Sequence, residues 1–327
     1  MAPDGSLGGL PVSVPGVTNG LDGGPGAGTA DATAPTLVWS DAAVPATADA
    51  ETPGTPPAVT PLVNAPPWAA QLLGHYAVQS IAFQQVGTTL VTRILEIQLT
   101  EIAQVNDTLE LQSHLCKHVE SNRVGTLTLV APVYLPPRRE RVVFDGDTFS
   151  TTPLDVAIGY DPSLPPDCVG KAGQRVPKRA FQSWIRGTDC ACAESGLPAS
   201  DDCRVLDPEH DGQPGFTQHA DFLSGPADVY GAIEKSSAMV AGMAQLDGRH
   251  WAQLSWHDRF AQLGCSATDC LDLTGVATGC ATVRNPVQFV PLDRLDQPAL
   301  GWTCELVLSR AAELFPGAGP AAPTSCP

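Results

Sequence analysis

An acidic loop at residues 207–215 carries the side chains that bind hard cations. It reads Asp207-Pro-Glu209-His-Asp211-Gly-Gln-Pro-Gly215, so carboxylates stand at alternate positions and a glycine follows the third. This spacing lets a tight turn direct several oxygen atoms at one Ca²⁺ ion, because the glycine accepts a turn that other residues disfavour. Asp207, Glu209 and Asp211 are therefore candidate calcium ligands.

The loop follows only the first half of an EF-hand calcium loop. An EF-hand has a bidentate glutamate at position twelve, where this chain has Gln218. Two interpretations stay open. Either calcium binds the three carboxylates and braces the segment, or the carboxylates form a solvated acidic turn.

A second cluster, at residues 114–118, alternates histidine and cysteine. On a strand His114, Cys116 and His118 would share one face, which is a ligand geometry for zinc or copper. The simpler interpretation is that Cys116 forms a disulfide and the histidines lie on a polar face, because a disulfide sulfur is not a thiolate ligand.

Aromatic residues are densest between residues 251 and 260. If this segment is a strand, Trp256 faces one way while Trp251 and His257 face the other. The indoles either line a ligand cavity or fill the core, and core filling is the commoner role of large aromatics. His257 and Asp258 are also the best local candidates for part of a hydrolase site.

Familiar catalytic motifs are missing from the sequence. There is no Gly-x-Ser-x-Gly elbow, His-Glu-x-x-His pair, P-loop or dinucleotide-binding glycine pattern. A catalytic triad need not be local in sequence, so this weakens the enzyme interpretation without closing it.

Ten cysteines at irregular spacing predict five disulfides formed in an oxidising compartment. No Cys-x-x-Cys pair points to a zinc ribbon or a thioredoxin-like site. The ten are Cys116, Cys168, Cys190, Cys192, Cys203, Cys265, Cys270, Cys280, Cys304 and Cys326. We therefore expect an extracytoplasmic protein, either secreted or anchored to the cell envelope.

The net charge argues against nucleic acid as a partner. The formal charge is −17 at pH 7, and such a surface repels phosphate backbones and anionic membranes. No stretch approaches the roughly 20 apolar residues of a transmembrane helix. The remaining partner classes are a small-molecule ligand and a protein ligand.

Composition divides the chain at about residue 67. Residues 1–67 contain twelve prolines and ten glycines with six acids, and neither lysine nor arginine. Such a segment cannot bury enough apolar surface to fold, so we expect a disordered tether. Residues 1–10 have neither the basic start nor the apolar run of a signal peptide, and we expect any lipid anchor to lie upstream of Met1.

Residues 68–327 are expected to form one disulfide-stapled, mainly β domain. The clearest pattern alternates Leu95, Ile97 and Leu99 with polar neighbours, which predicts a strand with one face in the core and the other in water. Residues 89–118 read as an antiparallel hairpin. Further strands are expected at residues 76–83, 125–135, 141–144, 148–152 and 286–290.

Other segments are less regular. Residues 161–225 lack periodicity and are expected to form an irregular, disulfide-rich insertion. Residues 226–246 fit either a helix or two strands, and the Asp247-Gly248 hairpin signal favours strands. Residues 302–315 are expected to form a short C-terminal helix. The fold class is thus an antiparallel barrel or sandwich, with a lipocalin-like barrel as the specific version.

Four features together resemble a known group of proteins. They are the Pro/Gly/Ala/Thr-rich arm, the alternating strands, the scattered cysteines and the Asp-x-Glu-x-Asp-Gly-x-Pro-Gly motif of residues 207–215. The resemblance is to uncharacterised exported and lipoprotein-type proteins of myxobacteria and related high-GC bacteria. It extends in style over most of the chain and implies an envelope location and no known activity.

Three functional hypotheses follow. The first is an exported, surface-displayed binding or interaction module, whose specific version encloses a small apolar ligand near Trp251, Trp256 and His257. The second is a secreted hydrolase without a recognisable local motif. The third is a structural envelope protein braced by calcium.

Overall fold

The computed structural model describes most of the chain after residue 61. The described residues are 62, 65–86, 90–164, 173–193, 196–222, 225–268, 270, 272–280, 284–295, 298, 301–317, 319–320, 322–323 and 326. Apart from residues 62 and 65–67, the predicted tether therefore lies outside them.

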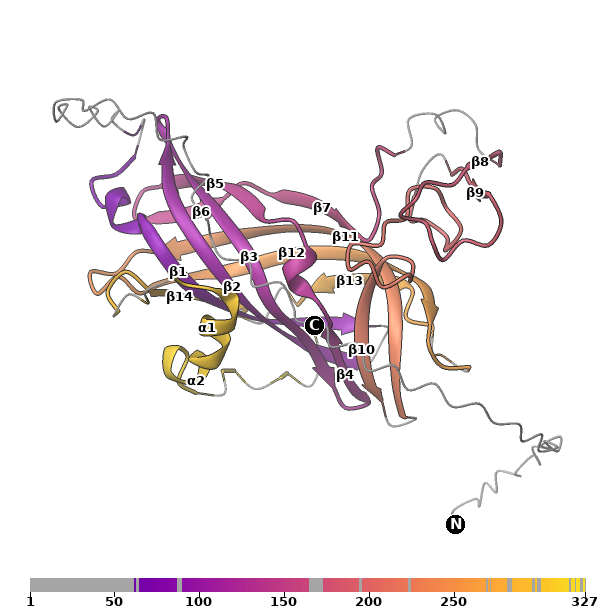
Figure 1. The fold of residues 1–327 in the computed structure, drawn as a ribbon. Coiled ribbons are helices and arrows are strands. Elements are labelled where there is room, and N and C mark those ends of the chain that lie inside the picture. The colour runs from indigo at the N-terminus through magenta and orange to yellow at the C-terminus, as the bar shows by residue number, and fades with distance from the viewer. Residues whose placement is uncertain are drawn as a thin grey trace, which may run out of the picture. The chain divides into compact units, whose positions relative to one another are not determined.

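Antiparallel strands make up most of the described chain (Figure 1). They are β1 (Gly74–Val86), β2 (Leu90–Val105), β3 (Thr108–Asn122), β4 (Gly125–Leu129), β5 (Arg138–Asp145), β6 (Thr148–Thr151), β7 (Leu154–Ile158), β8 (Arg175–Pro177), β9 (Asp189–Ala191), β10 (Phe216–Phe222), β11 (Gly225–Met243), β12 (His250–Cys265), β13 (Gly275–Gly279) and β14 (Pro286–Pro291). Helical turns are η1 (Ala69–Leu72), η2 (Pro132–Tyr134), α1 (Cys304–Ser309) and α2 (Ala311–Leu314). None of these described helices is long and apolar enough to cross a membrane.

The strand pairings form a ring. From β1 the ladder runs through β2, β3, β4, β10 and β11 to β12, and β12 returns to β1 through β13 and β14. At the other end of the long strands, β5 and β6 connect β3 to β11. Side chains from opposite walls contact one another across the inner face of the ring. The predicted mainly β, antiparallel fold is confirmed, and its sandwich alternative fits this packing.

Several predicted elements are confirmed and others are corrected: the strand expected at residues 125–135 ends at Leu129 as β4, and the helical turn η2 follows it. The predicted hairpin is present as β2 and β3. The segment 226–246, expected to be a helix or two strands, is one continuous strand, β11, as far as Met243, and the chain then turns at Asp247-Gly248 into β12. The irregular insertion ends at Gly215 rather than at residue 225, because Phe216–Phe222 pairs with both β4 and β11. The C-terminal helix is present as the two short turns α1 and α2.

One end of the inner face is apolar and closely packed. Tyr76, Phe149 and Phe289 meet edge to face, with ring centroids 5.8 and 6.2 Å apart, and Leu111 packs among them. The Tyr76 hydroxyl donates to the Leu72 carbonyl of η1 at 3.0 Å, so its one polar atom is satisfied where it is buried. This arrangement fixes η1 across the end of the ring.

The prediction that the polar face of residues 95–100 meets water was wrong. Glu96 and Thr100 point to the inner face and are buried, whereas Ile97 and Leu99 point outward. The outward apolar side chains are covered by Val307 and its neighbours on α1 and α2. Both faces of β2 are therefore shielded, because the ring encloses one and the C-terminal helices cover the other.

A disulfide attaches this helical cover. Cys116 of β3 is bonded to Cys304 at the start of α1, 188 residues later in the chain. Cys116 stands at a register irregularity between β2 and β3, which turns its side chain outward. The Thr303 hydroxyl accepts the Leu306 N–H at 3.2 Å and caps the short helix.

Charged residues fill the middle of the inner face. We call Glu96, His118, Glu120, Arg138, Glu140, Lys235 and Asp258 the interior charge cluster. Glu96 is its centre: its carboxylate accepts from Lys235 Nζ at 2.9 Å and from His118 Nδ1 at 3.1 Å, and Arg138 Nη1 lies 4.0 Å away. Glu96 lies on β2, and these three partners come from three other strands, β3, β5 and β11.

The cluster is strongly coupled electrostatically. Burial alone would raise the pKa of Glu96, but Lys235, His118 and Arg138 hold that pKa well below its usual range. Burial opposes protonation of His118, yet hydrogen bonds to Glu120 and Glu96, each 3.1 Å long, raise its pKa to about 9. The cluster therefore contains ionised groups of both signs at neutral pH.

We expect Glu96→Gln to destabilise the fold by about 3 kcal/mol or more, because it leaves Lys235 and His118 buried beside a neutral amide. Glu101→Gln is the matched control on the same strand: its carboxylate is partly exposed and 3.9 Å from an exposed histidine, so a loss below about 1 kcal/mol is expected. Urea unfolding measures both. Equal losses in the two variants would contradict the central role of Glu96.

We also expect stability to fall in alkaline solution through His118. Its pKa is higher in the folded protein, about 9 against 6.5, so its contribution is complete below about pH 6.5 and is lost as pH rises through 9. The loss amounts to up to about 3 kcal/mol of unfolding free energy. Urea unfolding at several pH values should show a shallower alkaline decline in His118→Gln than in the exposed control His75→Gln. Identical profiles would refute the assignment.

Candidate functional site

The insertion between β7 and β10 packs on the outer face of the ring. Tyr160 and Val205 form an antiparallel bridge across its base. Both contact Ala232 of β11 and Leu263 of β12 in one small apolar cluster. The sheet thus provides the floor against which the irregular segment is built.

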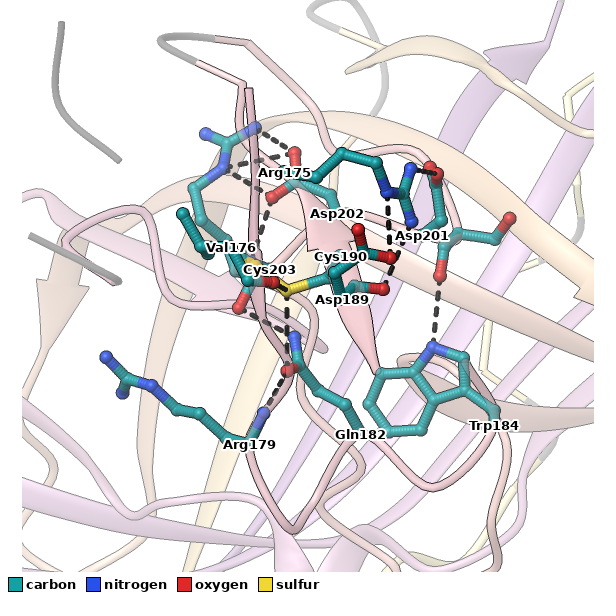
Figure 2. The surroundings of a disulfide bond; sticks show 12 residues. Arg175, Val176, Arg179, Gln182, Trp184, Asp189, Cys190, Asp201, Asp202 and Cys203 are labelled. Atoms are coloured by element: carbon teal, nitrogen blue, oxygen red, sulfur yellow. Dashed lines mark hydrogen bonds and ion pairs between the residues drawn. A yellow bond between two sulfur atoms is a disulfide. The ribbon is translucent and has the colours of Figure 1, made fainter. Parts of the chain in front are cut away.

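A disulfide and a buried amide organise the interior of the insertion (Figure 2). Cys190 is bonded to Cys203, and Gln182, which is fully buried, donates to the Cys203 carbonyl at 2.9 Å. The Gln182 side-chain oxygen accepts the Arg179 N–H at 2.6 Å. A segment without a regular hydrogen-bond ladder is thereby ordered by side-chain bonds to its own backbone.

An ion pair adds to this rigidity. Arg204 and Asp202 have side chains only 5% and 1% exposed, and they meet at 2.9 Å. The Arg204 guanidinium also lies over the Tyr160 ring, 5.6 Å from its centroid. The pair therefore connects the insertion to the residue that anchors it on the sheet.

The acidic loop of the sequence prediction closes the insertion. The Asp207 carboxylate accepts the N–H groups of Asp211 and Gly212 at 3.1 and 2.9 Å, and Glu209 accepts the Thr217 N–H at 3.0 Å. Burial raises the pKa of Glu209 to about 7. The carboxylates thus bind the loop's own backbone. In the part of the chain that is described, no three acidic, histidine or cysteine side chains are grouped so as to hold a metal ion. Calcium binding stays a prediction.

Position 215 of this loop must be a glycine. Its φ is +81°, and a Cβ there would overlap the Gly231 carbonyl oxygen on β11. Its N–H donates to the Leu206 carbonyl at 2.7 Å. The insertion can therefore return into β10 in close contact with the neighbouring strand.

A groove of about 510 Å³ lies between the insertion and the strands β11 and β12. Trp184 and Pro214 are on its insertion side, and Tyr230 and Leu263 are on its sheet side. The Trp184 Nε1–H donates to the Ser200 carbonyl at 3.0 Å, which fixes the indole (Figure 2). The groove therefore offers aromatic and apolar surface on rigid elements, as ligand sites commonly do.

Two arginines give the groove its polarity. Arg175 is neutralised, because Asp189 lies 3.1 Å from its Nε and Asp201 lies 3.0 Å from its Nη1 (Figure 2). Arg186 is exposed, and within the described ranges no ion pair includes it. A ligand with an anionic group could therefore use Arg186, while its apolar part contacts Trp184 and Tyr230.

The predicted ligand residues of β12 are not brought together. Trp256 is buried on the inner face, where it packs against Ala82 and Ile94. Trp251 and His257 are exposed on the outer face. These opposite directions follow the alternation that the sequence predicted.

The suggested hydrolase pair is separated in the same way. Asp258 belongs to the interior charge cluster opposite Lys235, and burial raises its pKa to about 6, with a further contribution from Glu120. His257 lies on the other side of the strand and is exposed. The two neighbours therefore do not face a common substrate position.

The suggested His114, Cys116 and His118 ligand set is also divided. Cys116 is in a disulfide, as the simpler interpretation held. The register irregularity beside it puts His118 against Glu96 on the inner face, while His114 pairs with the outward-facing Leu99. The predicted common face does not exist, because the extra residue reverses the alternation.

The groove residues were not among the site residues predicted from the sequence. Trp184 and Arg186 stand in a segment without periodicity, and Tyr230 stands in the segment that fitted either a helix or two strands. A tryptophan close to an arginine in a polar, cysteine-rich loop was the available signal, since loops on a rigid scaffold often carry binding residues.

We expect loss of the Cys190–Cys203 bond to loosen the groove and leave the sheet intact. A variant with both cysteines changed to serine should lose up to about 3 kcal/mol of local stability. The loss is not larger because the two cysteines are only 13 residues apart, and a short closed loop restricts the unfolded chain less than a long one. Limited proteolysis should then cut within residues 173–215. The control removes Cys280 and Cys326, whose bond lies outside the insertion. Protection of 173–215 in the first variant would be inconsistent with this role.

Comparison with known proteins found no match for this chain among protein-family models, curated proteins or solved structures.

Proposed function

We propose that the protein is an exported binding module whose ligand occupies the groove between the insertion and β11–β12. The observation that carries this proposal is the placement of Trp184, Tyr230 and Arg186 around one hollow with rigid walls. Aromatic rings and arginine are the side chains that most often dominate binding energy. Because these residues come from segments far apart in sequence, the fold itself assembles the site.

Disulfide bonding supports an extracytoplasmic location. Four disulfides are present among the described residues, and Cys192 is disulfide-bonded as well. Such bonds persist in oxidising compartments and are rare in the cytosol. Secretion and anchoring to the cell envelope are both consistent with this chemistry.

The inner face offers little support for the apolar-carrier version of the proposal. Aromatic side chains pack one end of the ring, and the interior charge cluster crosses its middle. An apolar ligand there would have to displace buried groups that hydrogen-bond one another, at a high cost in free energy. The groove is open to ligands without such displacement.

We expect Trp184→Ala to weaken ligand binding at least about 30-fold, as removal of a central aromatic contact typically does. The full chain would be screened on an array of glycans and extended peptides. Any ligand found would then be titrated with Trp184→Ala and with a control variant. Trp251→Ala is the matched control, because Trp251 is an exposed tryptophan (37%) outside the groove. Binding that survives Trp184→Ala, or that Trp251→Ala abolishes, would count against the groove.

A further inference from the structure

We propose that the inner face of the ring binds a small protonated amine that carries a hydroxyl group, with the Asp258 carboxylate as its anionic partner. The site is formed by β1, β12 and β13, apart from the groove of the insertion. Three features support it. Asp258 is buried without a bonded partner, the neighbouring bases bond to other acids, and two more buried polar atoms beside it lack hydrogen bonds.

The Asp258 carboxylate is buried without a partner. The residue is 8% exposed, and within the described ranges its oxygens take part in no hydrogen bond or ion pair. Burial raises the pKa of Asp258 to about 6, the charge of Glu120 adds to this rise, and Lys235 opposes it. A buried carboxylate that ionises in this position costs free energy until a cation or several donors satisfy it.

The bases of the interior charge cluster bond to acids other than Asp258. Lys235 stands opposite Asp258 on the neighbouring strand β11, yet its Nζ donates to Glu96 at 2.9 Å. The bonded pairs are Lys235 with Glu96, His118 with Glu96 and Glu120, and Arg138 with Glu140. Four acids thus share three bases in this described interior, and Asp258 is the acid that receives none. One added positive charge would balance it.

Two further buried polar atoms on the same face lack partners. Gln84 of β1 is 4% exposed, and its Nε2 donates to Glu120 at 3.3 Å, whereas its Oε1 accepts no hydrogen bond from any described group. The carboxylate fixes this orientation of the amide, because only the NH₂ end can donate to it. Trp256 is 5% exposed, and its Nε1–H is unbonded in the same sense. Buried atoms of this kind normally have a partner.

Strand register places these groups around two small residues of β13. Asp258 is opposite Ala277, and Gln84 is opposite Gly279. A Cβ at Gly279 would overlap the Trp256 ring, so the indole lies over this glycine. Gln84 and Asp258 are two strands and two residues apart, which is about 12 Å between their Cα atoms. Two side chains and one bridging group span that distance.

An ammonium group matches these acceptors. It has three N–H donors, which the Asp258 carboxylate, Gln84 Oε1 and the nearby Glu120 carboxylate would accept. The Trp256 ring would contact the methylene carbons of the ligand, and its Nε1–H would donate to the hydroxyl oxygen. Solvent reaches this part of the inner face, because the Glu120 side chain is 19% exposed. A small molecule can therefore enter without displacing any bonded group.

Ethanolamine is the probe that tests the proposal, by saturation-transfer NMR titration of the full-length chain. Ethanolamine should bind, and ethylene glycol, which has a hydroxyl in place of the ammonium, should not. Asp258→Asn should weaken ethanolamine binding at least about tenfold, because the ammonium loses its charged partner. Asp155→Asn, at an exposed aspartate of β7, is the matched control and should keep the affinity of the unmodified chain.

Thermal unfolding without amine separates binding from a structural role. Asp258→Asn should melt at the same temperature as the unmodified chain or higher, because it removes a buried charge that no base satisfies. A carboxylate that holds the fold together would give the opposite result. A variant that melts lower or fails to fold would therefore overturn the assignment of Asp258.

Trp256→Phe tests the hydroxyl contact, since it keeps a ring and removes the Nε1–H donor. Its affinity for ethanolamine should fall to that for ethylamine, which lacks the hydroxyl, while its affinity for ethylamine stays the same. Trp251→Phe, at the outward-facing tryptophan of the same strand, should change neither affinity. Equal binding of ethanolamine and ethylene glycol, or no binding of either, would overturn the proposal. Displacement of ethanolamine by an equal concentration of potassium chloride would assign the position to an inorganic cation instead.

Discussion

The carboxylate of Glu96 connects four strands that are distant in sequence. Groups from β3, β5 and β11 converge on this one side chain of β2. A buried carboxylate is tolerated only when several donors satisfy it, so the strands must meet in one register to provide them. A displacement of any of these strands by one residue would turn its charged group to the other face. We regard this cluster as a device that specifies strand register as well as a source of stability.

The polar side chains on the inner face of β2 determine which of its side chains face outward. Since the inner face of β2 takes Glu96 and Thr100, its apolar Ile97 and Leu99 face outward and need a cover. The C-terminal helices supply that cover, and the Cys116–Cys304 bond keeps them in place although they are too short to be stable alone. Similarly, the insertion covers the outer side of β11 and β12 through Tyr160 and Val205. The ring is thus enclosed on two sides by segments that depend on side-chain anchors.

The sequence predicted the parts of this fold that depend on neighbouring residues. Alternation and turn residues were enough for the β2–β3 hairpin and for the turn at Asp247-Gly248. They could not tell which face of β2 is inside, because a period of two says only that the faces differ. The β10 strand was not predicted. Phe216, Gln218 and Ala220 face the same way along it, but they follow directly on a segment rich in turn residues, and Gln218 interrupts the apolar pattern. The groove was beyond local patterns, since Trp184 and Tyr230 meet only through the insertion's anchors on the sheet.

These constraints explain why the binding residues belong in the insertion. The inner face is filled by aromatic and charged side chains whose replacement would disturb register, and part of the outer face is covered by the terminal helices. A segment outside the strand ring can change its surface residues without changing the pairing of any strand. The cost is that such a segment lacks a hydrogen-bond ladder, and the Cys190–Cys203 bond, Gln182 and the buried Asp202–Arg204 pair replace it. The rigidity of the groove therefore comes from cross-links and buried polar bonds, while its position comes from the sheet beneath.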